Sequence, residues 1–356
     1  MKSLRPKKSL GNQLGRLKRK AVDLSPGRLI DIENLESDRG LPRIARPAIE
    51  GVNLASWLSK NRALVQRELQ QHGGILFRGF KIDSDVDFQT LIQADADEML
   101  DYTYRSTPRT RVSGNVFTST EYPPDQSIPM HNEMSYTRSW PLKIWFFCMQ
   151  PSEAGGETPI ADSHRVYERI DPAMRDRFAE QGVLYVRNYG DQLDLSWEDV
   201  FQTSERTEVE AFCSERGIEV EWREGNRLRT RQRCQGVVEH PQSGKQLWFN
   251  QAHLFHVSGL PEAIQEALLS SLGEENLPRN TYYGDGAPIE AEVLQHITEC
   301  FEQEMVVFPW QKGDVLLLDN MAVAHGRRPF SGTRRVLAGM TGSSDAIGVT
   351  SEKTTA

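Results

Sequence analysis

Apolar residues recur at intervals of three and four along several segments of the chain, and this spacing predicts amphipathic helices. The clearest helix is predicted at 54–71, and Gly73-Gly74 ends it. Its apolar face consists of Leu54, Trp57, Leu58, Leu64, Val65 and Leu69. The same spacing predicts further helices at 85–100, 166–181, 205–215, 261–272 and 290–304.

Short runs rich in β-branched and aromatic residues, each bounded by turn-forming residues, predict strands. The first is Gly74-Ile-Leu-Phe-Arg-Gly-Phe80. The others are predicted at 144–149, 183–187, 235–239, 246–250, 315–318 and 336–340. Many short strands, with helices at the start and in insertions, favour a mainly β fold of the sandwich or jelly-roll type over a regular βαβ alternation.

Length and composition limit the classes of protein. The chain has 356 residues, enough to bury a sizeable core. It has no apolar run of the roughly 18 residues that a membrane span needs, so we expect no membrane association. The four cysteines are scattered, which excludes a disulfide scaffold and favours a reducing, cytoplasmic location. We expect one domain over 26–350 and a polar tail at 351–356, because no linker or repeat interrupts the composition.

Charge is distributed unevenly. The net charge is −8, yet the first twenty residues contain eight lysines and arginines and no acid. A nucleic-acid-binding arm and an organelle presequence are two interpretations of this head. We favour a disordered tail over 1–25, since no aromatic residue interleaves the basic ones and an acidic body would repel nucleic acid.

The segment Ile128-Pro-Met-His-Asn-Glu-Met-Ser-Tyr136 carries the first candidate chemistry. Side chains alternate in an extended segment, so His131 and Glu133 point to one face and Asn132 to the other. An imidazole and a carboxylate on one face form two adjacent corners of a metal site. A His-x-Glu triplet arises often by chance, so this pair does not establish a metal site by itself.

A second segment, 313–335, supplies a third candidate ligand. The apolar strand predicted at 315–318 ends in a polar turn, and His325 follows where the rim of a barrel would present it inward. Two histidines and one carboxylate match the facial triad of non-haem iron(II) oxygenases, which leaves positions open for other ligands. The alternative is that His325 is only a hydrogen-bonded rim residue.

Several motifs in order make the chain resemble the iron(II)- and 2-oxoglutarate-dependent oxygenases of the taurine dioxygenase-like (TauD/TfdA) superfamily. The similar branch contains the clavaminate synthase-like and syringomycin-biosynthesis aspartyl-hydroxylase-like proteins. The resemblance covers roughly 72–340. It rests on His72-Gly-Gly-Ile-Leu-Phe-Arg-Gly-Phe80, Thr118-Ser-Thr-Glu-Tyr-Pro-Pro124, His131-Asn-Glu133, Gly155-Gly-Glu-Thr-Pro-Ile-Ala-Asp162, Trp248-Phe-Asn-Gln251 and the 325–335 run.

This resemblance implies a double-stranded β-helix (jelly roll) and a role for each matching residue. His131, Glu133 and His325 would hold Fe(II), and Thr158 would hydrogen-bond the distal carboxylate of 2-oxoglutarate. A buried carboxylate also needs a cation, and a guanidinium binds it bidentately. Arg334 would supply it, nine residues after the distal histidine. Arg335 is the second choice, because a one-residue gap would exchange the two.

The resemblance also implies a reaction: O2 and 2-oxoglutarate are consumed, succinate and CO2 are formed, and an unactivated C–H bond is hydroxylated, desaturated or cyclised. Halogenating relatives lack the carboxylate ligand, so Glu133 argues against halogenation. The expected substrate is a small amino-acid-derived or natural-product molecule of secondary metabolism, either free or tethered to a carrier protein. Candidate substrate contacts are Arg109, Arg111, Asn115 and Asn250.

Two other functions use the same residues. A zinc hydrolase or lyase would need the three metal ligands but not Arg334 or Thr158, and a non-catalytic binding module would not need an intact triad. The alternating arginines Arg227, Arg229, Arg231 and Arg233 predict either a solvated edge strand or a patch for an anionic substrate or carrier arm. Three further histidines, His240, His253 and His256, are expected to make structural hydrogen bonds, and His72 and His296 to lie on helix surfaces or ends. The oligomeric state cannot be predicted from this sequence.

Overall fold

The structure is a computed structural model that describes residues 29–35, 39–96, 98–102, 104, 106–190 and 193–347. The basic head expected at 1–25 and the polar tail expected at 351–356 lie outside these ranges. No helix within the described ranges is long and apolar enough to cross a membrane.

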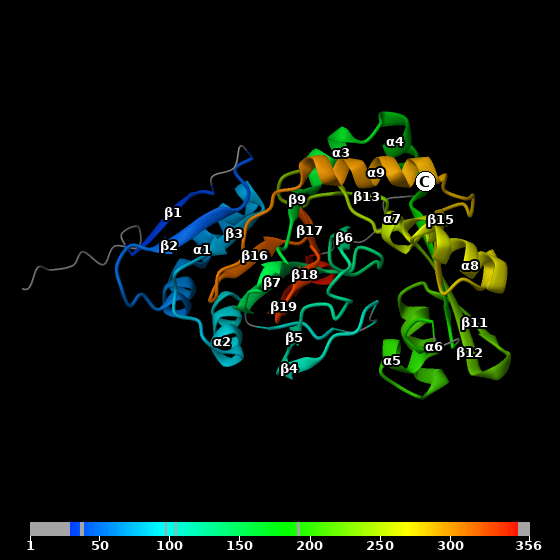
Figure 1. Ribbon diagram of the computed structural model, residues 1–356, viewed down its shortest axis with the longest axis horizontal. Helices are drawn as coiled ribbons and strands as arrows, with labels where there is room; N and C mark the ends of the chain where they lie inside the picture. Colours follow the sequence, from blue (N-terminus) through cyan, green and yellow to red (C-terminus); the bar gives the residue numbers. More distant parts are fainter. Residues whose placement is uncertain are drawn as a thin grey trace, which may run out of the picture.

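The largest element is an eight-stranded sheet at the centre of the molecule (Figure 1). All neighbouring strands pair antiparallel except β2 and β3, which are parallel. In spatial order the strands are β1 (Ile30–Asn34), β2 (Arg43–Pro47), β3 (Gly74–Phe77), β16 (Val315–Asp319), β7 (Pro141–Gln150), β19 (Arg335–Ser343), β5 (Val116–Thr118) and β4 (Arg111–Ser113).

Strand β16 shows why this sheet is apolar on both faces. Successive side chains of a strand point to opposite faces. Val315 and Leu317 pack into a cluster with residues of the N-terminal helices, whereas Leu316 and Leu318 pack into a second cluster on the other face. A strand covered on both sides is expected to be a continuous apolar run, as this one is.

The second layer is a three-stranded sheet of β6 (Ile128–His131), β17 (Val323–Arg327) and β9 (Ile160–Asp162). Ile160 and Val323 pack against the inner face of the large sheet. A short pair, β8 (Ala154–Gly155) and β18 (Phe330–Ser331), lies next to it in sequence. The two layers form the jelly roll with accessory helices that the sequence predicts, and the mainly β fold class is confirmed.

Most helices agree with the sequence pattern. The predictions at 54–71, 205–215, 261–272 and 290–304 are confirmed by α1 (Leu54–His72), α6 (Arg206–Glu215), α8 (Glu262–Leu272) and α9 (Ala291–Glu304). The helix predicted at 85–100 is α2 (Asp85–Asp95), which ends five residues early because Met99 bridges to Thr341 of the large sheet.

The single helix predicted at 166–181 is wrong. The segment forms two helices, α3 (Ser163–Arg169) and α4 (Pro172–Gln181). Asp171 separates them, since its side chain accepts hydrogen bonds from the backbone N–H groups of Ala173 and Met174, and Pro172 occupies the first turn of α4. Both features start a new helix rather than continue one.

A four-stranded sheet lies at the opposite end of the molecule from α1 and α2 (Figure 1). Its inner face packs into an aromatic-rich cluster that includes Tyr185, Tyr189 and Leu228. The sheet consists of β11 (Glu219–Arg223), β12 (Arg227–Cys234), β10 (Val183–Tyr189) and β15 (Arg279–Tyr283). Next to it lie α5 (Trp197–Phe201) and α7 (Ala252–Phe255), whereas the hairpin of β13 (Val237–Glu239) and β14 (Gln246–Trp248) packs against α3 and α4.

The arginine-rich strand β12 is not an edge strand, because β11 and β10 flank it on both sides. That interpretation of the sequence is therefore wrong. Two of its alternating arginines are held by local acceptors: Arg229 Nε donates to Asn188 Oδ1 at 2.8 Å, and Arg233 Nε donates to the Gln181 carbonyl at 2.7 Å. The alternating arginines therefore serve to make hydrogen bonds on the outer face of this sheet.

Candidate active site

Two histidines face each other across the β6–β17 strand pair. His131 ends β6, His325 lies within β17, and their Cα atoms are register partners. Residues directly opposite in an antiparallel pair point to the same face and lie within side-chain contact. The ring centroids are 4.6 Å apart. Strand register thus joins two residues that are distant in the sequence.

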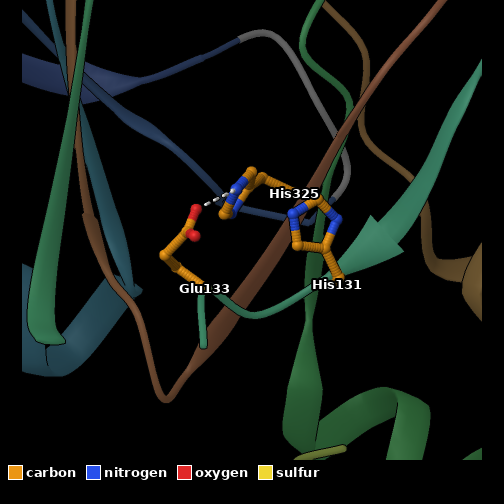
Figure 2. A group of neighbouring side chains, drawn as sticks. All are labelled: His131, Glu133 and His325. Atoms are coloured by element: carbon orange, nitrogen blue, oxygen red, sulfur yellow. Dashed lines mark ion pairs between the residues drawn. The ribbon is translucent and has the colours of Figure 1, made fainter. Parts of the chain in front are cut away.

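Glu133 completes the group just after β6. Asn320, in the turn after β16, clamps its backbone: Glu133 N donates to Asn320 Oδ1 at 2.7 Å, and Asn320 Nδ2 donates to the Glu133 carbonyl at 2.9 Å. Glu133 Oε2 lies 3.8 Å from His325 Nε2. One ligand atom from each of the three side chains lies within 4.8 Å of the others, and Figure 2 shows the three converging.

The residue between the two ligands, Asn132, turns away from this group, as the alternation predicts. Its Nδ2 donates to the Asn320 carbonyl at 2.7 Å and to Ser163 Oγ at 3.0 Å. Gln251 Nε2 donates to the Asn132 carbonyl at 2.8 Å. Asn132 therefore anchors the ligand segment to the fold while its neighbours face the site.

Both imidazoles are suited to bind a cation. Burial lowers the pKa of His131, and burial together with the nearby His131 and Arg109 lowers the pKa of His325 well below its usual value. Both rings are therefore neutral at pH 7. His131 Nδ1 donates to the Pro129 carbonyl at 2.8 Å, which leaves its Nε2 lone pair for a metal. Two neutral imidazoles and one carboxylate fit Fe(II).

A half-buried cation, Arg334, lies near the β8–β18 turns. Arg334 Nε donates to the Gly156 carbonyl at 2.8 Å, Nη1 to Ser119 Oγ at 3.3 Å, and Nη2 to Thr158 Oγ1 at 3.4 Å. All three acceptors are neutral. Burial, with a smaller contribution from Arg327, lowers the pKa of Arg334 to about 10. A half-buried positive charge with only neutral partners is suited to receive an anion.

Thr158 connects this cation to the histidine site. Its hydroxyl oxygen accepts from Trp310 Nε1 at 3.1 Å as well as from Arg334, so its own hydrogen remains available to a ligand. It precedes by two residues Ile160, the register partner of His325. Residues two apart share a face and are roughly 7 Å apart along a strand. A dicarboxylate of modest length can span that separation.

Arg335 points elsewhere. It begins β19 opposite Gln150, and its side chain is exposed. Neighbouring strand residues face opposite sides, so the structure brings Arg334, not Arg335, to Thr158.

The four candidate substrate contacts occupy different environments. Arg109 is buried, and its Nη2 donates to Glu133 Oε2 at 2.6 Å. Arg111 and Asn115 lie on the β4–β5 hairpin, where Arg111 Nη1 donates to Asn115 Oδ1 at 2.7 Å, and Arg111 also pairs with Asp101 at the surface. Asn250 is buried and bonds the backbone of Gly236. Of the four, only Arg109 contacts the triad directly.

His240, His253 and His256 make structural hydrogen bonds, as expected. His240 Nε2 lies 3.1 Å from Asp319 Oδ2, and His253 Nε2 lies 2.9 Å from the Met130 carbonyl. Within the part of the chain that the structure describes, the triad is the one group of three or more His, Cys, Asp and Glu side chains placed to hold a metal.

The sequence did not identify three residues of the site individually: Asn320, Trp310 and Ser119. Asn320 and Ser119 lie within segments that had drawn attention, the polar turn after 315–318 and the Thr118–Pro124 motif. Trp310 had no signal that separated it from a core tryptophan.

Comparison with known proteins gives a consistent result. Residues 37–341 match the family described as "Taurine catabolism dioxygenase TauD, TfdA family". The dapdiamide synthesis protein DdaC of Enterobacter agglomerans is 44% identical over 268 residues, which cover 75% of this chain and 82% of that protein. A clavaminate synthase-like protein of Arabidopsis thaliana is 38% identical over 283 residues, which cover 76% and 82%.

A solved structure shows the same fold. The PvcB protein from Pseudomonas aeruginosa superimposes with a TM-score of 0.51 at 15% identity, over 92% of this chain and 94% of that one. A second structure of PvcB describes that protein as an Fe, alpha-ketoglutarate dependent oxygenase from an isonitrile synthetic pathway.

Proposed function

The chain belongs to the taurine catabolism dioxygenase TauD, TfdA family, and we propose that His131, Glu133 and His325 hold its Fe(II) and that Arg334 and Thr158 hold its 2-oxoglutarate. The protein is an iron(II)- and 2-oxoglutarate-dependent dioxygenase. The observation that carries the assignment of residues is the three-ligand group on the same face of the β6–β17–β9 sheet as Thr158, which Arg334 contacts.

The protein residues divide the work. The triad binds the metal on one side and leaves positions for other ligands. Arg334 neutralises the distal carboxylate of 2-oxoglutarate, and the free hydroxyl hydrogen of Thr158 donates to the same group. Phe146 packs edge-on against the His325 ring, with centroids 5.0 Å apart, and so places an apolar group beside this ligand. Bound there, iron supplies the chemistry that couples decarboxylation of 2-oxoglutarate to succinate and CO2 with O2-dependent attack on a substrate C–H bond.

We propose an amino-acid-derived natural-product substrate, free or tethered to a carrier protein. The support is the similarity to DdaC, a protein of dapdiamide synthesis. Hydroxylation is the expected outcome, and desaturation or cyclisation uses the same residues.

Two proposals on organisation accompany this function. Residues 26–350 form one catalytic domain, which is supported by the convergence of ligands from β6 and β17. The location is cytoplasmic, which is supported by the four free, buried cysteines.

The test is an anaerobic Fe(II) titration in the presence of 2-oxoglutarate, followed by a succinate-release screen over amino acids in air. We expect a weak visible charge-transfer band, and succinate that depends on Fe(II). Glu133→Ala should lose both signals, whereas the matched variant Glu121→Ala, on the loop before the site, should keep them. Absence of the band and of succinate from the native protein would overturn the assignment, and activity that persisted without O2 would indicate a hydrolase or lyase.

A further inference from the structure

Arg109 is a buried cation beside the metal ligands. It is 7% exposed, and its guanidinium carbon lies 4.5 Å from the centroid of the Tyr102 ring. Its Nη2 donates to Glu133 Oε2 at 2.6 Å, and both side chains are almost fully buried. The guanidinium therefore lies directly against the carboxylate that we assign to iron.

Within the described ranges, the remaining nitrogens of Arg109 have no hydrogen-bond partner. Nε and Nη1 are both buried without a hydrogen bond. A buried donor without an acceptor is costly, and native proteins keep few of them unless a ligand, ion or water completes the site. Tyr102 places its ring face against the guanidinium, and the hydrogens on Nε and Nη1 point to a missing acceptor.

The charge of the assembled site also calls for an anion. Fe(II), the Glu133 carboxylate and the 2-oxoglutarate dianion together carry one negative charge, which Arg334 offsets. Arg109 then adds one positive charge, and burial makes an uncompensated charge unfavourable. One monoanionic group restores neutrality, whereas a phosphomonoester dianion would exceed it.

We infer that Arg109 binds a carboxylate of the substrate, and that the enzyme therefore acts on a molecule with a free carboxylate, such as an α-amino acid or its N-acyl derivative. This inference rests on the proposed function. The planar guanidinium can donate to both carboxylate oxygens through Nη1 and the second hydrogen of Nη2. The contact places the bound carboxylate next to Glu133 and so fixes which part of the substrate reaches the metal.

The test uses four forms of the full chain: the native protein, Arg109→Met, Arg109→Lys, and Arg111→Met as the matched control. Arg111 is two residues away, exposed, and paired with Asp101 at the surface. Each form is loaded anaerobically with Fe(II) and 2-oxoglutarate, and the charge-transfer band is recorded first. The probes are then titrated: L-amino acids, N-acetyl-L-amino acids and the primary amides of both, with β-alanine and taurine as a carboxylate–sulfonate pair.

We expect all four forms to show the band. In the native protein, carboxylate probes should bind, as measured by the change in the band, at least roughly tenfold more tightly than their amides. Arg109→Met should bind the same acids roughly 10- to 100-fold more weakly, while Arg111→Met should not change. Arg109→Lys should be intermediate, because it keeps the charge but not the fork. Melting temperatures check that each variant is folded.

Other outcomes separate the two proposals. A native protein without the band contradicts the proposed function. A native protein with the band, but no probe acid that perturbs it more than its amide, overturns the role of Arg109 alone. A preference for taurine over β-alanine would also overturn the role of Arg109 alone. So would a loss of Fe(II) affinity in Arg109→Met, because Arg109 would then only position Glu133.

Discussion

At the metal end of the proposed site, His131 and His325 lie opposite each other on hydrogen-bonded strands. At its anion end, by contrast, a side-chain hydrogen bond joins Arg334 to Thr158 beside glycine turns. Strand register determines the first arrangement, and the backbone hydrogen bonds between paired strands hold that register in place. The second depends on close packing, since Gly156 leaves only enough room for the Arg334 side chain. The metal end should therefore lose function only when a ligand is removed, and the anion end when its packing is disturbed.

The largest effect is expected at the metal end from His325→Ala. Fe(II) affinity should fall by more than about 100-fold, since even groups behind metal ligands contribute roughly 10- to 100-fold. Succinate formation should disappear. Anaerobic Fe(II) titration measures the first effect, and His72→Ala at the end of α1 is the control. If His325→Ala kept the native Fe(II) affinity, the metal end would not depend on this ligand, and the proposed difference between the two ends would be contradicted.

The next effect is expected at the anion end from Arg334→Met. Loss of a charge-assisted, forked interaction should weaken 2-oxoglutarate binding by roughly 100-fold. Fe(II) affinity should not change, because Arg334 is not a ligand. Isothermal titration of the Fe(II)-loaded protein with 2-oxoglutarate measures this. Arg335→Met is the matched control, and a larger effect there would exchange the roles of the two arginines.

A smaller effect is expected from Gly156→Ala, which tests whether packing controls the anion end. A Cβ there would lie 2.5 Å from Ser152 Oγ and 3.0 Å from Arg334 Cδ, at a φ of +72°. We expect roughly tenfold weaker 2-oxoglutarate binding, and a free energy of unfolding lower by about 1–2 kcal/mol from the left-handed backbone alone. Gly244→Ala shares the positive φ but meets nothing within 4 Å, so it should show only the loss of stability.

The smallest effect near neutral pH is expected from pH itself. Burial lowers the pKa of His131 and of His325 below 6.5, so protons compete with Fe(II) only at lower pH. Fe(II) affinity should stay constant from neutral pH to 6.5 and fall only where the pH approaches the lowered pKa values of the two histidines. The pKa of Arg334, lowered to about 10, predicts that 2-oxoglutarate affinity falls as pH rises through that value. Separate isotherms test both, and a tenfold loss of Fe(II) affinity above pH 6.5 would contradict the first.

Local patterns predicted what depends on local structure. The period of two placed His131 and Glu133 on one face and Asn132 on the other, and the helical spacing found α1 and α9 almost to the residue. The error at 166–181 had a local cause as well, since Asp171 and Pro172 both favour the start of a new helix. The apolar period continued across them and hid the break.

Long-range pairing could not be derived in the same way. Nothing in the spacing of His131 and His325 indicates that their strands are neighbours in register, and the expectation rested on a resemblance. Arg109 and Arg111 show why such pairing cannot be predicted. Although only one residue separates them, Arg109 is buried against Glu133, whereas Arg111 forms an ion pair at the surface. Tertiary packing decides between these, and no alternation in that irregular segment distinguishes them.

The clamp made by Asn320 has a consequence for the loading of iron. Because this amide holds both the N–H and the carbonyl of Glu133, and also donates to the Pro141 carbonyl at 2.8 Å, the ligand-bearing loop is already ordered by the protein. The site is thus preorganised, and we expect that little of the free energy of metal binding is consumed in ordering the backbone. The polar turn after β16 therefore orders the proposed iron site before iron binds.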